Sequence, residues 1–305
     1  MYEISILDLK KLKPKKREVY AHMLRQGYKY LFDNPDLLDS SNKNLMAVLA
    51  TLNKVPVGLV IGEKKSKEEL EIKSMYVEEE HKTKNLLVRM LKVLEAEFSA
   101  KDGRYMQAIY ANTPFFMEEW EKTFIQLGWT GRRLAVVECY YDDGYNFHPS
   151  WLEKEYTLPP DFEIFPWKDL TEAESEAIKK AYSQKAIPDE VYPFAAGAVY
   201  EPLNSLGLRH EGKVVGWLIT RQLDPETICY YSIYTDYEFH NRGFIIMLLI
   251  KALKLQQQSS FNKAIFRVNI LKLPNLKWLR FVRKRLAPYG QYTEYYLAWH
   301  AIRSL

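Results

Sequence analysis

Cysteine is scarce in this 305-residue sequence, which contains only Cys139 and Cys229. Two cysteines cannot provide the disulfide framework that is typical of small secreted domains. The sequence also lacks any run of about 18 apolar residues, the length that a membrane-crossing helix needs. We therefore expect a cytoplasmic protein without a membrane span.

Several motifs that carry chemistry are missing as well. The sequence has no Gly-x-Ser-x-Gly elbow, no Walker loop and no Rossmann fingerprint. Its six histidines do not fall at metal-ligand spacing with cysteine or a carboxylate, so we expect no metal. The net charge of +4 is small beside 43 basic and 39 acidic residues, and we expect no nucleic-acid partner.

What the sequence does contain is a repeat with a long period. Gly58 and Gly216, Tyr76 and Tyr234, and Trp120 and Trp278 are each separated by 158 positions. Hydrophobic residues make up 47% of the chain, enough for two cores of ordinary size. The repeat therefore predicts two copies of one domain.

Hydrophobic periodicity predicts the same order of elements in both copies. In the first copy the periodicity predicts strands at 45–52, 55–61, 70–77, 105–111 and 134–141, with helices at 85–98 and 114–127. The second predicts strands at 205–210, 213–221, 228–235, 263–269 and 292–299, with helices at 242–257 and 274–286. We place the domains at 1–145 and 161–305, with a linker at 146–160 that is rich in polar residues and proline.

This order resembles the GNAT family of N-acetyltransferases. In that family an Arg/Gln-x-x-Gly-x-Gly/Ala loop opens the helix after the third strand. The corresponding runs are Lys82-Thr83-Lys84-Asn85-Leu86-Leu87 and His240-Asn241-Arg242-Gly243-Phe244-Ile245. The second run keeps one glycine and the first keeps none. The resemblance implies an α/β (α+β) fold of two tandem GNAT-like domains, each a mixed, mostly antiparallel sheet flanked by helices.

The resemblance also implies the donor. Backbone N–H groups at a helix N-terminus bind the pyrophosphate of coenzyme A, and glycine lets the backbone approach it. We therefore expect acetyl-CoA or another acyl-CoA to bind the second domain, and the first domain to be degenerate. The implied cofactor-binding residues are Tyr234, Thr235, His240, Asn241, Arg242, Gly243, Phe244 and Ile245.

Candidate catalytic groups are poorer matches to the family. The glutamate base of many members falls at Glu71 in the first copy and at Cys229, a poor base, in the second. The family's tyrosine acid falls at Phe124 in the first copy, whereas Tyr289 could serve in the second. Asp236 and His240 stand beside the second loop, so either could accept the proton of an amine, but both could equally be solvated.

We therefore expect an N-acyltransferase that moves an acyl group, by default acetyl, from acyl-CoA to an amine-bearing small molecule or peptide. Transfer of a longer acyl chain from CoA or an acyl carrier protein is one alternative. The other is a non-catalytic scaffold. Lys277, Arg280 and Lys284 fall on one stripe of the last helix, which could be a solvated face or could dock an acidic partner or the phosphates of CoA.

Overall fold

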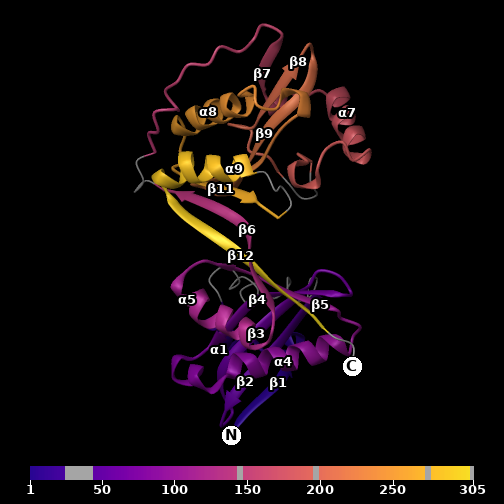
Figure 1. Cartoon of the computed structure of the whole chain (residues 1–305), viewed down its shortest axis with the longest axis vertical. Coiled ribbons are helices and arrows are strands. Elements are labelled where there is room, and N and C mark those ends of the chain that lie inside the picture. The colour runs from indigo at the N-terminus through magenta and orange to yellow at the C-terminus, as the bar shows by residue number, and fades with distance from the viewer. Residues whose placement is uncertain (25–43, 143–146, 195–198, 272–275, 303–305) are drawn as a thin grey trace. The chain divides into compact units, whose positions relative to one another are not determined.

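The computed structural model describes residues 1–24, 44–142, 147–194, 199–271 and 276–302. The chain forms two compact units (Figure 1). Unit 1 comprises Met1–Ala135 and Tyr295–Leu305, and unit 2 comprises Val136–Glu294. Among the described residues no helix has the length and apolar character needed to cross a membrane.

Unit 1 contains a sheet of strand order β1-β2-β3-β4-β5-β12, in which β4 and β5 pair in parallel and all other neighbouring strands pair antiparallel. Its strands are β1 (Tyr2–Leu7), β2 (Leu45–Leu52), β3 (Val55–Lys64), β4 (Glu69–Val77), β5 (Tyr105–Ala111) and β12 (Gln291–Ala301). Its helices and helical turns are η1 (Leu9–Lys11), α1 (Pro14–Ala21), η4 (Glu79–Lys84), α4 (Leu86–Ser99), α5 (Pro114–Phe116), η5 (Met117–Glu121) and α6 (Lys122–Gln126).

Unit 2 contains a sheet of order β6-β11-β10-β9-β8-β7, in which β10 and β11 form the parallel pair. Its strands are β6 (Thr130–Tyr141), β7 (Phe162–Pro166), β8 (Leu206–His210), β9 (Lys213–Asp224), β10 (Thr227–Thr235) and β11 (Lys263–Asn269). Its helices and turns are η6 (Trp167–Asp169), α7 (Glu172–Ser183), η7 (Asp189–Val191), η8 (Tyr237–Phe239), α8 (Phe244–Gln257), α9 (Leu276–Phe281), η9 (Val282–Leu286) and η10 (Ala287–Tyr289).

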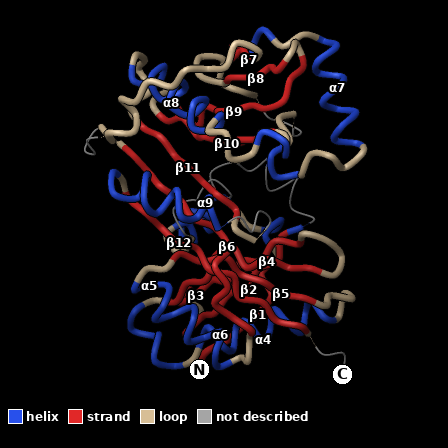
Figure 2. The backbone as a smooth tube through the Cα atoms, turned by 45° about the horizontal axis from the view of Figure 1, so that its top comes forward, coloured by secondary structure: helices blue, strands red, loops and turns tan. Residues whose placement is uncertain are grey.

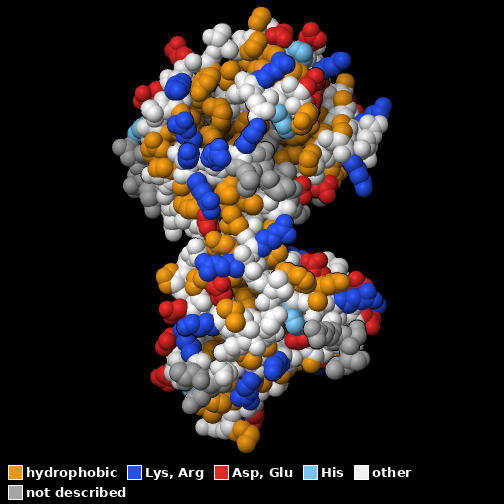
Figure 3. Space-filling model, in the orientation of Figure 1, with side chains coloured by type: hydrophobic (Ala, Val, Ile, Leu, Met, Phe, Trp, Pro, Cys, Tyr) orange, Lys and Arg blue, Asp and Glu red, His pale blue; other side chains and the backbone are white. Residues whose placement is uncertain are grey.

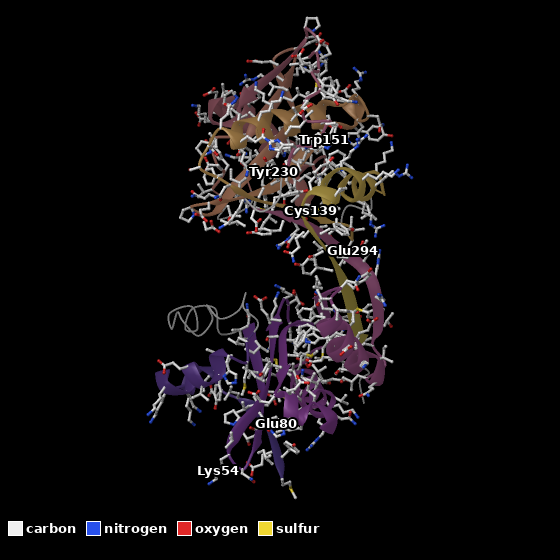
Figure 4. All side chains as sticks on the ribbon, turned by 90° about the vertical axis from the view of Figure 1, so that its left-hand side faces the viewer. Lys54, Glu80, Cys139, Trp151, Tyr230 and Glu294 are labelled. Carbon is white, nitrogen blue, oxygen red and sulfur yellow. The ribbon has the colours of Figure 1, made fainter. Side chains whose placement is uncertain are left out.

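Helices cover both faces of each sheet (Figure 2). In unit 1, α4 buries the apolar side chains that recur along one of its faces, which are Leu86, Leu87, Met90, Leu91, Leu94 and Phe98. Residues of η1 and α1 pack on the opposite face of the sheet, against Ala47, Leu49, Leu59 and Ile61. Figure 4 shows Lys54 at the tip of the β2–β3 hairpin, where Asn53 and Lys54 adopt the left-handed backbone of a two-residue turn.

The predicted repeat and fold class are confirmed, and the register of the strands repeats with them. Glu69 pairs with Tyr105 in unit 1, and Thr227 pairs with Lys263 in unit 2, so both partners shift by 158 positions. The equivalent strands β4 and β10 also carry a bulge at the same place, at Lys73 in β4 and at Tyr231 in β10. Positions 158 apart therefore occupy equivalent places in the two folds.

The compact units differ in composition from the two copies of the repeat, for which we predicted bounds of 1–145 and 161–305, because the copies exchange their last strands. Residues 136–141 of β6, which end the first copy, pair with β11 of unit 2. Residues 295–301 of β12, which end the second copy, pair with β5 of unit 1. Backbone pairing, which the repeat in the sequence cannot reveal, therefore decides the composition of each unit.

Among the described strands and α-helices, β1, β7, α1 and α7 were not predicted from the sequence, nor were the short helical turns such as η7. β1 and β7 are edge strands of six and five residues, too short for a clear alternation. The start of α7 did carry a signal, because Thr171 and Glu174 form a capping box.

Candidate functional site

The parallel strands of unit 2 separate towards their carboxyl ends. β10 and β11 pair over residues 227–230 and 263–266, whereas the strands continue to Thr235 and Asn269. The bulge at Tyr231 stands where the pairing ends. Strand edges that diverge leave backbone N–H and C=O groups available to another partner.

A cavity of about 410 Å³ occupies this opening. β10 contributes Tyr231 to its wall, β11 contributes Val268, and α9 and η9 contribute Trp278 and Val282. Tyr230 also borders the cavity and lies inside unit 2, where its hydroxyl donates to Gln256 Oε1 of α8 at 2.8 Å (Figure 4). The walls are mostly apolar side chains, which suits a long and largely apolar ligand.

The corresponding opening in unit 1 is filled by aromatic side chains. β4 and β5 also separate, after residues 72 and 108. Tyr110, Trp120 and Phe124 are 1%, 0% and 2% exposed. The ring centroids of Tyr110 and Trp120 lie 5.8 and 6.2 Å from that of Phe124. Unit 1 therefore offers no equivalent channel at this position among the described residues.

Two substitutions between the copies account for this difference. Tyr110 and Phe124 of unit 1 correspond, 158 positions on, to Val268 and Val282 of unit 2. Trp120 corresponds to Trp278, which is half-buried and lines the cavity instead of filling it. Smaller side chains at two of three equivalent positions thus leave the space open.

The loop before α8 has the backbone that an anion site requires. Gly243 caps α8 with φ 85°, and Asn241 also has a positive φ of 67°. The first N–H groups of a helix point along its axis without intrahelical partners. Asn85, the counterpart of Gly243, caps α4 with φ 52°, so loss of the glycine changed the side chain but kept the left-handed turn.

The charge beside the two loops is opposite. Lys277 of α9 donates to Asn241 Oδ1 at 2.7 Å, which holds an ammonium group next to the loop of unit 2. Its counterpart in unit 1 is Glu119, whose carboxylate pairs with Lys82 of η4. A cation favours phosphate at the second loop, and a carboxylate disfavours it at the first. Figure 3 shows basic side chains gathered over α9.

Glu71 lies in an ion-pair cluster of unit 1. Lys73 Nζ lies 2.6 Å from Glu71 Oε1, and Lys65 Nζ lies 3.4 Å from Glu71 Oε2. Glu63 also pairs with both lysines, at 2.7 Å from Lys65 Nζ and 3.2 Å from Lys73 Nζ. Two carboxylates and two ammonium groups therefore compensate one another, as in a structural network.

Cys229, the counterpart of Glu71, lines the cavity of unit 2. Burial raises the pKa of its thiol, so the group is neutral near pH 7 and does not serve as a base. This agrees with the expectation from the sequence that Cys229 is a poor base.

The other predicted residues of the second copy cluster at the end of β10. Tyr234 donates from its hydroxyl to Asp236 Oδ1 at 2.8 Å, and His240 Nε2 lies 2.9 Å from the carbonyl oxygen of Thr235. Burial raises the pKa of Asp236, which makes this carboxylate more basic than usual. Neither Asp236 nor His240 is among the residues that line the cavity.

Three loop residues flank Gly243 differently. Arg242 is exposed and lies above the ring of Phe239 at 5.5 Å. Phe244 is 3% exposed and stacks on Phe162, so its side chain anchors the helix. Ile245 is half-buried. The backbone of this run is therefore fixed by packing of its own side chains.

Tyr289 does not line the cavity in which we expect the acyl donor to bind. Its ring contacts Phe147 at a centroid distance of 5.8 Å. Tyr292, the other tyrosine nearby, donates to Glu294 Oε1 at 2.6 Å. These contacts do not favour either tyrosine as an acid towards a leaving thiolate in the cavity.

Two carboxylates that no sequence motif singled out line the cavity, Asp189 and Glu190. They belong to η7, which is held to the sheet because Ser232 Oγ and Trp217 Nε1 donate to the carbonyl oxygen of Val191 at 2.7 and 2.9 Å. A three-residue turn has no periodicity, although Pro188 before two acidic residues is a recognisable turn signal.

Solved structures with the same arrangement of elements cover the whole chain. A tandem GNAT protein from the clavulanic acid biosynthesis pathway matches 100% of this chain and 100% of its own, with a TM-score of 0.63 and 9% identity. A GCN5-related N-acetyltransferase from Sphaerobacter thermophilus matches 99% of this chain and 96% of its own, with a TM-score of 0.63 and 14% identity.

A third similar structure is a fungal multi-domain GH3 β-N-acetylglucosaminidase that contains a GCN5-related glucosamine N-acetyltransferase region. It matches 98% of this chain and 38% of its own, with a TM-score of 0.61 and 13% identity. No family model and no curated protein matches the sequence. The similarities show the fold: this chain has the tandem GNAT fold, and its structural neighbours are described as GNAT proteins and acetyltransferases.

Proposed function

We propose that the protein is an N-acyltransferase whose unit 2 binds acyl-CoA and transfers the acyl group to an amine. The open cavity between β10 and β11 carries this proposal. Its apolar walls would take the pantetheine arm and the acyl group, and the strand edges would pair with the amides of the arm. The N-terminus of α8 and Lys277 would bind the phosphates.

In the proposed reaction the amine nitrogen attacks the thioester carbonyl carbon. A C–N bond forms and the C–S bond breaks, the amine loses a proton to a base, and the CoA thiolate leaves and takes up a proton. Asp189 and Glu190 are the carboxylates at the cavity wall, and we take them as the candidate bases in place of Glu71. A backbone N–H near the bulge at Tyr231 would polarise the thioester carbonyl.

The apolar lining favours a second candidate within the same class, transfer of an acyl chain longer than acetyl. Phe266, Phe281 and Leu286 are also part of the apolar wall, which would suit a chain with more methylene groups than acetyl. Arg280 and Lys284, exposed on the α9–η9 segment, would suit CoA phosphates or an acidic acyl carrier protein as the source of that chain.

Calorimetric titration with acetyl-CoA and with acyl-CoAs of increasing length tests the proposal. Lys277→Glu should weaken binding by on the order of 10-fold, because it replaces an attractive charge beside the phosphates with a repulsive one. Glu119→Lys, the matched change in unit 1, should leave binding unchanged. Gly243→Glu should abolish binding. Because Gly243 has a positive φ, glutamate there would also strain the backbone of the loop, so this variant is a less specific test than Lys277→Glu.

Equal loss in the Lys277 and Glu119 variants would contradict the assignment to unit 2. A parent protein that binds no acyl-CoA and acylates no amine, with donors on CoA and on a carrier protein, would favour the scaffold alternative instead.

A further inference from the structure

Arg221 of β9 presents a guanidinium edge that has no partner in the described part of the chain. Its Nε and Nη2 atoms are buried and donate no hydrogen bond there. Its central carbon lies 3.2 Å from the ring centroid of Tyr231, so the group is stacked on the tyrosine. Nε and Nη2 form the edge of the guanidinium that binds a carboxylate through two parallel hydrogen bonds. Leaving such a group unpaired costs free energy in the unliganded protein.

At the equivalent positions of unit 1 the charged side chains balance one another. Positions 63, 65, 71 and 73 there hold the cluster of two glutamates and two lysines described above. Their counterparts in unit 2 are Arg221, Leu223, Cys229 and Tyr231. One positive charge therefore replaces a balanced set of four, and no neighbouring position of that set supplies an anion.

Arg221 adjoins the cavity through its neighbours, although it is not itself one of the residues that line it. It pairs across the β9–β10 ladder with Cys229, and it stacks on Tyr231. Both of these residues line the cavity. Asp189 and Glu190 line the same cavity from η7. The site thus combines a cation with an unused fork and a pair of carboxylates.

We propose that Arg221 binds a carboxylate of the acceptor, so that the acyl acceptor is an amine that also carries a carboxylate, as an amino acid does. This inference rests on the proposed function. The Arg221 fork would fix the carboxylate, while Asp189 or Glu190 would receive the ammonium group and direct it to the thioester. Stacking on Tyr231 holds the fork in place before the acceptor arrives.

Acetyl transfer to amino acids and to their primary amides tests this assignment, because the two sets differ only in the carboxylate. The parent protein should prefer the amino acids. Arg221→Met should raise KM for the amino acids by on the order of 10- to 100-fold and leave the amides unchanged. Arg221→Lys, which keeps the charge but not the fork, should fall between the two. Lys213→Met, at an exposed position on the same strand, is the matched control.

Two further measurements separate the possible causes. Thermal unfolding of Arg221→Met should occur at the same or a higher temperature than that of the parent, because the change removes a buried unpaired charge. A large decrease would mean that Arg221 is structural and would overturn the proposal. Calorimetry with the acetyl-CoA donor and with the amino acids is carried out separately for parent and variant.

Equal use of amino acids and amides by the parent, with unchanged donor binding, would overturn the role of Arg221 and leave the acyltransferase proposal standing. Amino-acid binding that depends on Arg221 without any acyl-CoA binding would instead support the carboxylate site and contradict the transferase.

Discussion

At the scale of single residues, the contacts of each carboxylate distinguish a structural role in unit 1 from a candidate catalytic role in unit 2. Glu71 matches the catalytic glutamate of the GNAT pattern in sequence, yet two lysines hold its carboxylate. Glu190 has no counterpart in that pattern, yet it lines the cavity of the unit whose opening is free. Proximity to an open cavity is a requirement for a base that a sequence motif cannot test.

We therefore predict that Glu71→Gln leaves the rate of acyl transfer nearly unchanged, whereas Glu190→Gln or Asp189→Asn lowers kcat by on the order of 10²-fold. Steady-state rates with one donor and one amine measure the difference. Asp236→Asn and His240→Ala belong in the same series, since Asp236 has a raised pKa. A large loss for Glu71→Gln alone would move the active site to unit 1.

A second prediction concerns acid stability. The hydrogen bonds from Arg209, with Nε 2.6 Å from Glu174 Oε1, are the main reason that the pKa of Glu174 is lowered from its ordinary 4.5 to about 2, and hydrogen bonds from Thr171 add to the effect. A lowered pKa stabilises the fold fully above about pH 4.5, and that stabilisation is lost as the pH falls towards 2. The urea midpoint should therefore fall over this window, and Glu174→Gln should lower it at pH 7 and reduce the pH dependence.

The control for this prediction is Glu176→Gln on the same helix. Glu176 is 65% exposed and forms a surface ion pair with Lys179, so its replacement should change the midpoint little. The same pH dependence in the parent and in Glu174→Gln would show that the Arg209 contact is not its source.

Among the elements, the two helices after the second parallel strand decide which opening can hold a ligand. The segment α5–η5–α6 brings Trp120 and Phe124 into the core of unit 1. The segment α9–η9 brings Trp278 and Val282 to the wall of a cavity. Periodicity predicted both helices at nearly the same bounds, but it does not register the volume of the side chains that face the sheet.

Val282→Phe should consequently fill part of the cavity of unit 2 and abolish acyl-CoA binding, while the fold is retained. Calorimetry measures the binding, and circular dichroism checks the fold. The reciprocal change, Phe124→Val, should lower the stability of unit 1 by about 2–4 kcal/mol, because it leaves a void in a packed core. It should not affect donor binding. Unimpaired binding by Val282→Phe would place the donor elsewhere.

The chain as a whole is a tandem repeat whose copies complete each other's sheets. A fragment of residues 146–305, cut at the repeat, lacks β6 and exposes the edge of β11. It also retains β12 residues whose partner strand, β5, is absent. A fragment that follows the compact unit, Val136–Glu294, keeps the β6–β11 pairing.

We predict that Val136–Glu294 is soluble and unfolds cooperatively in urea, whereas 146–305 aggregates or unfolds without a transition. Size-exclusion chromatography and fluorescence-monitored unfolding distinguish the two fragments. The reverse result, with the fragment cut at the repeat being the stable one, would mean that the strand exchange does not determine the unit.

The sequence alone determined the repeat, the fold class and the type of most elements, because each depends on local periodicity and turn chemistry. The resemblance to the GNAT motif also pointed to the strand-to-helix turn at Gly243, where the structure has a φ of 85° that favours glycine. Only the tertiary structure decided which strand completes which sheet, which of two similar openings is empty, and which charged groups already have partners. These properties arise from side chains and strand edges that are more than a hundred positions apart, where pairing, volume and charge compensation leave no pattern in a single sequence.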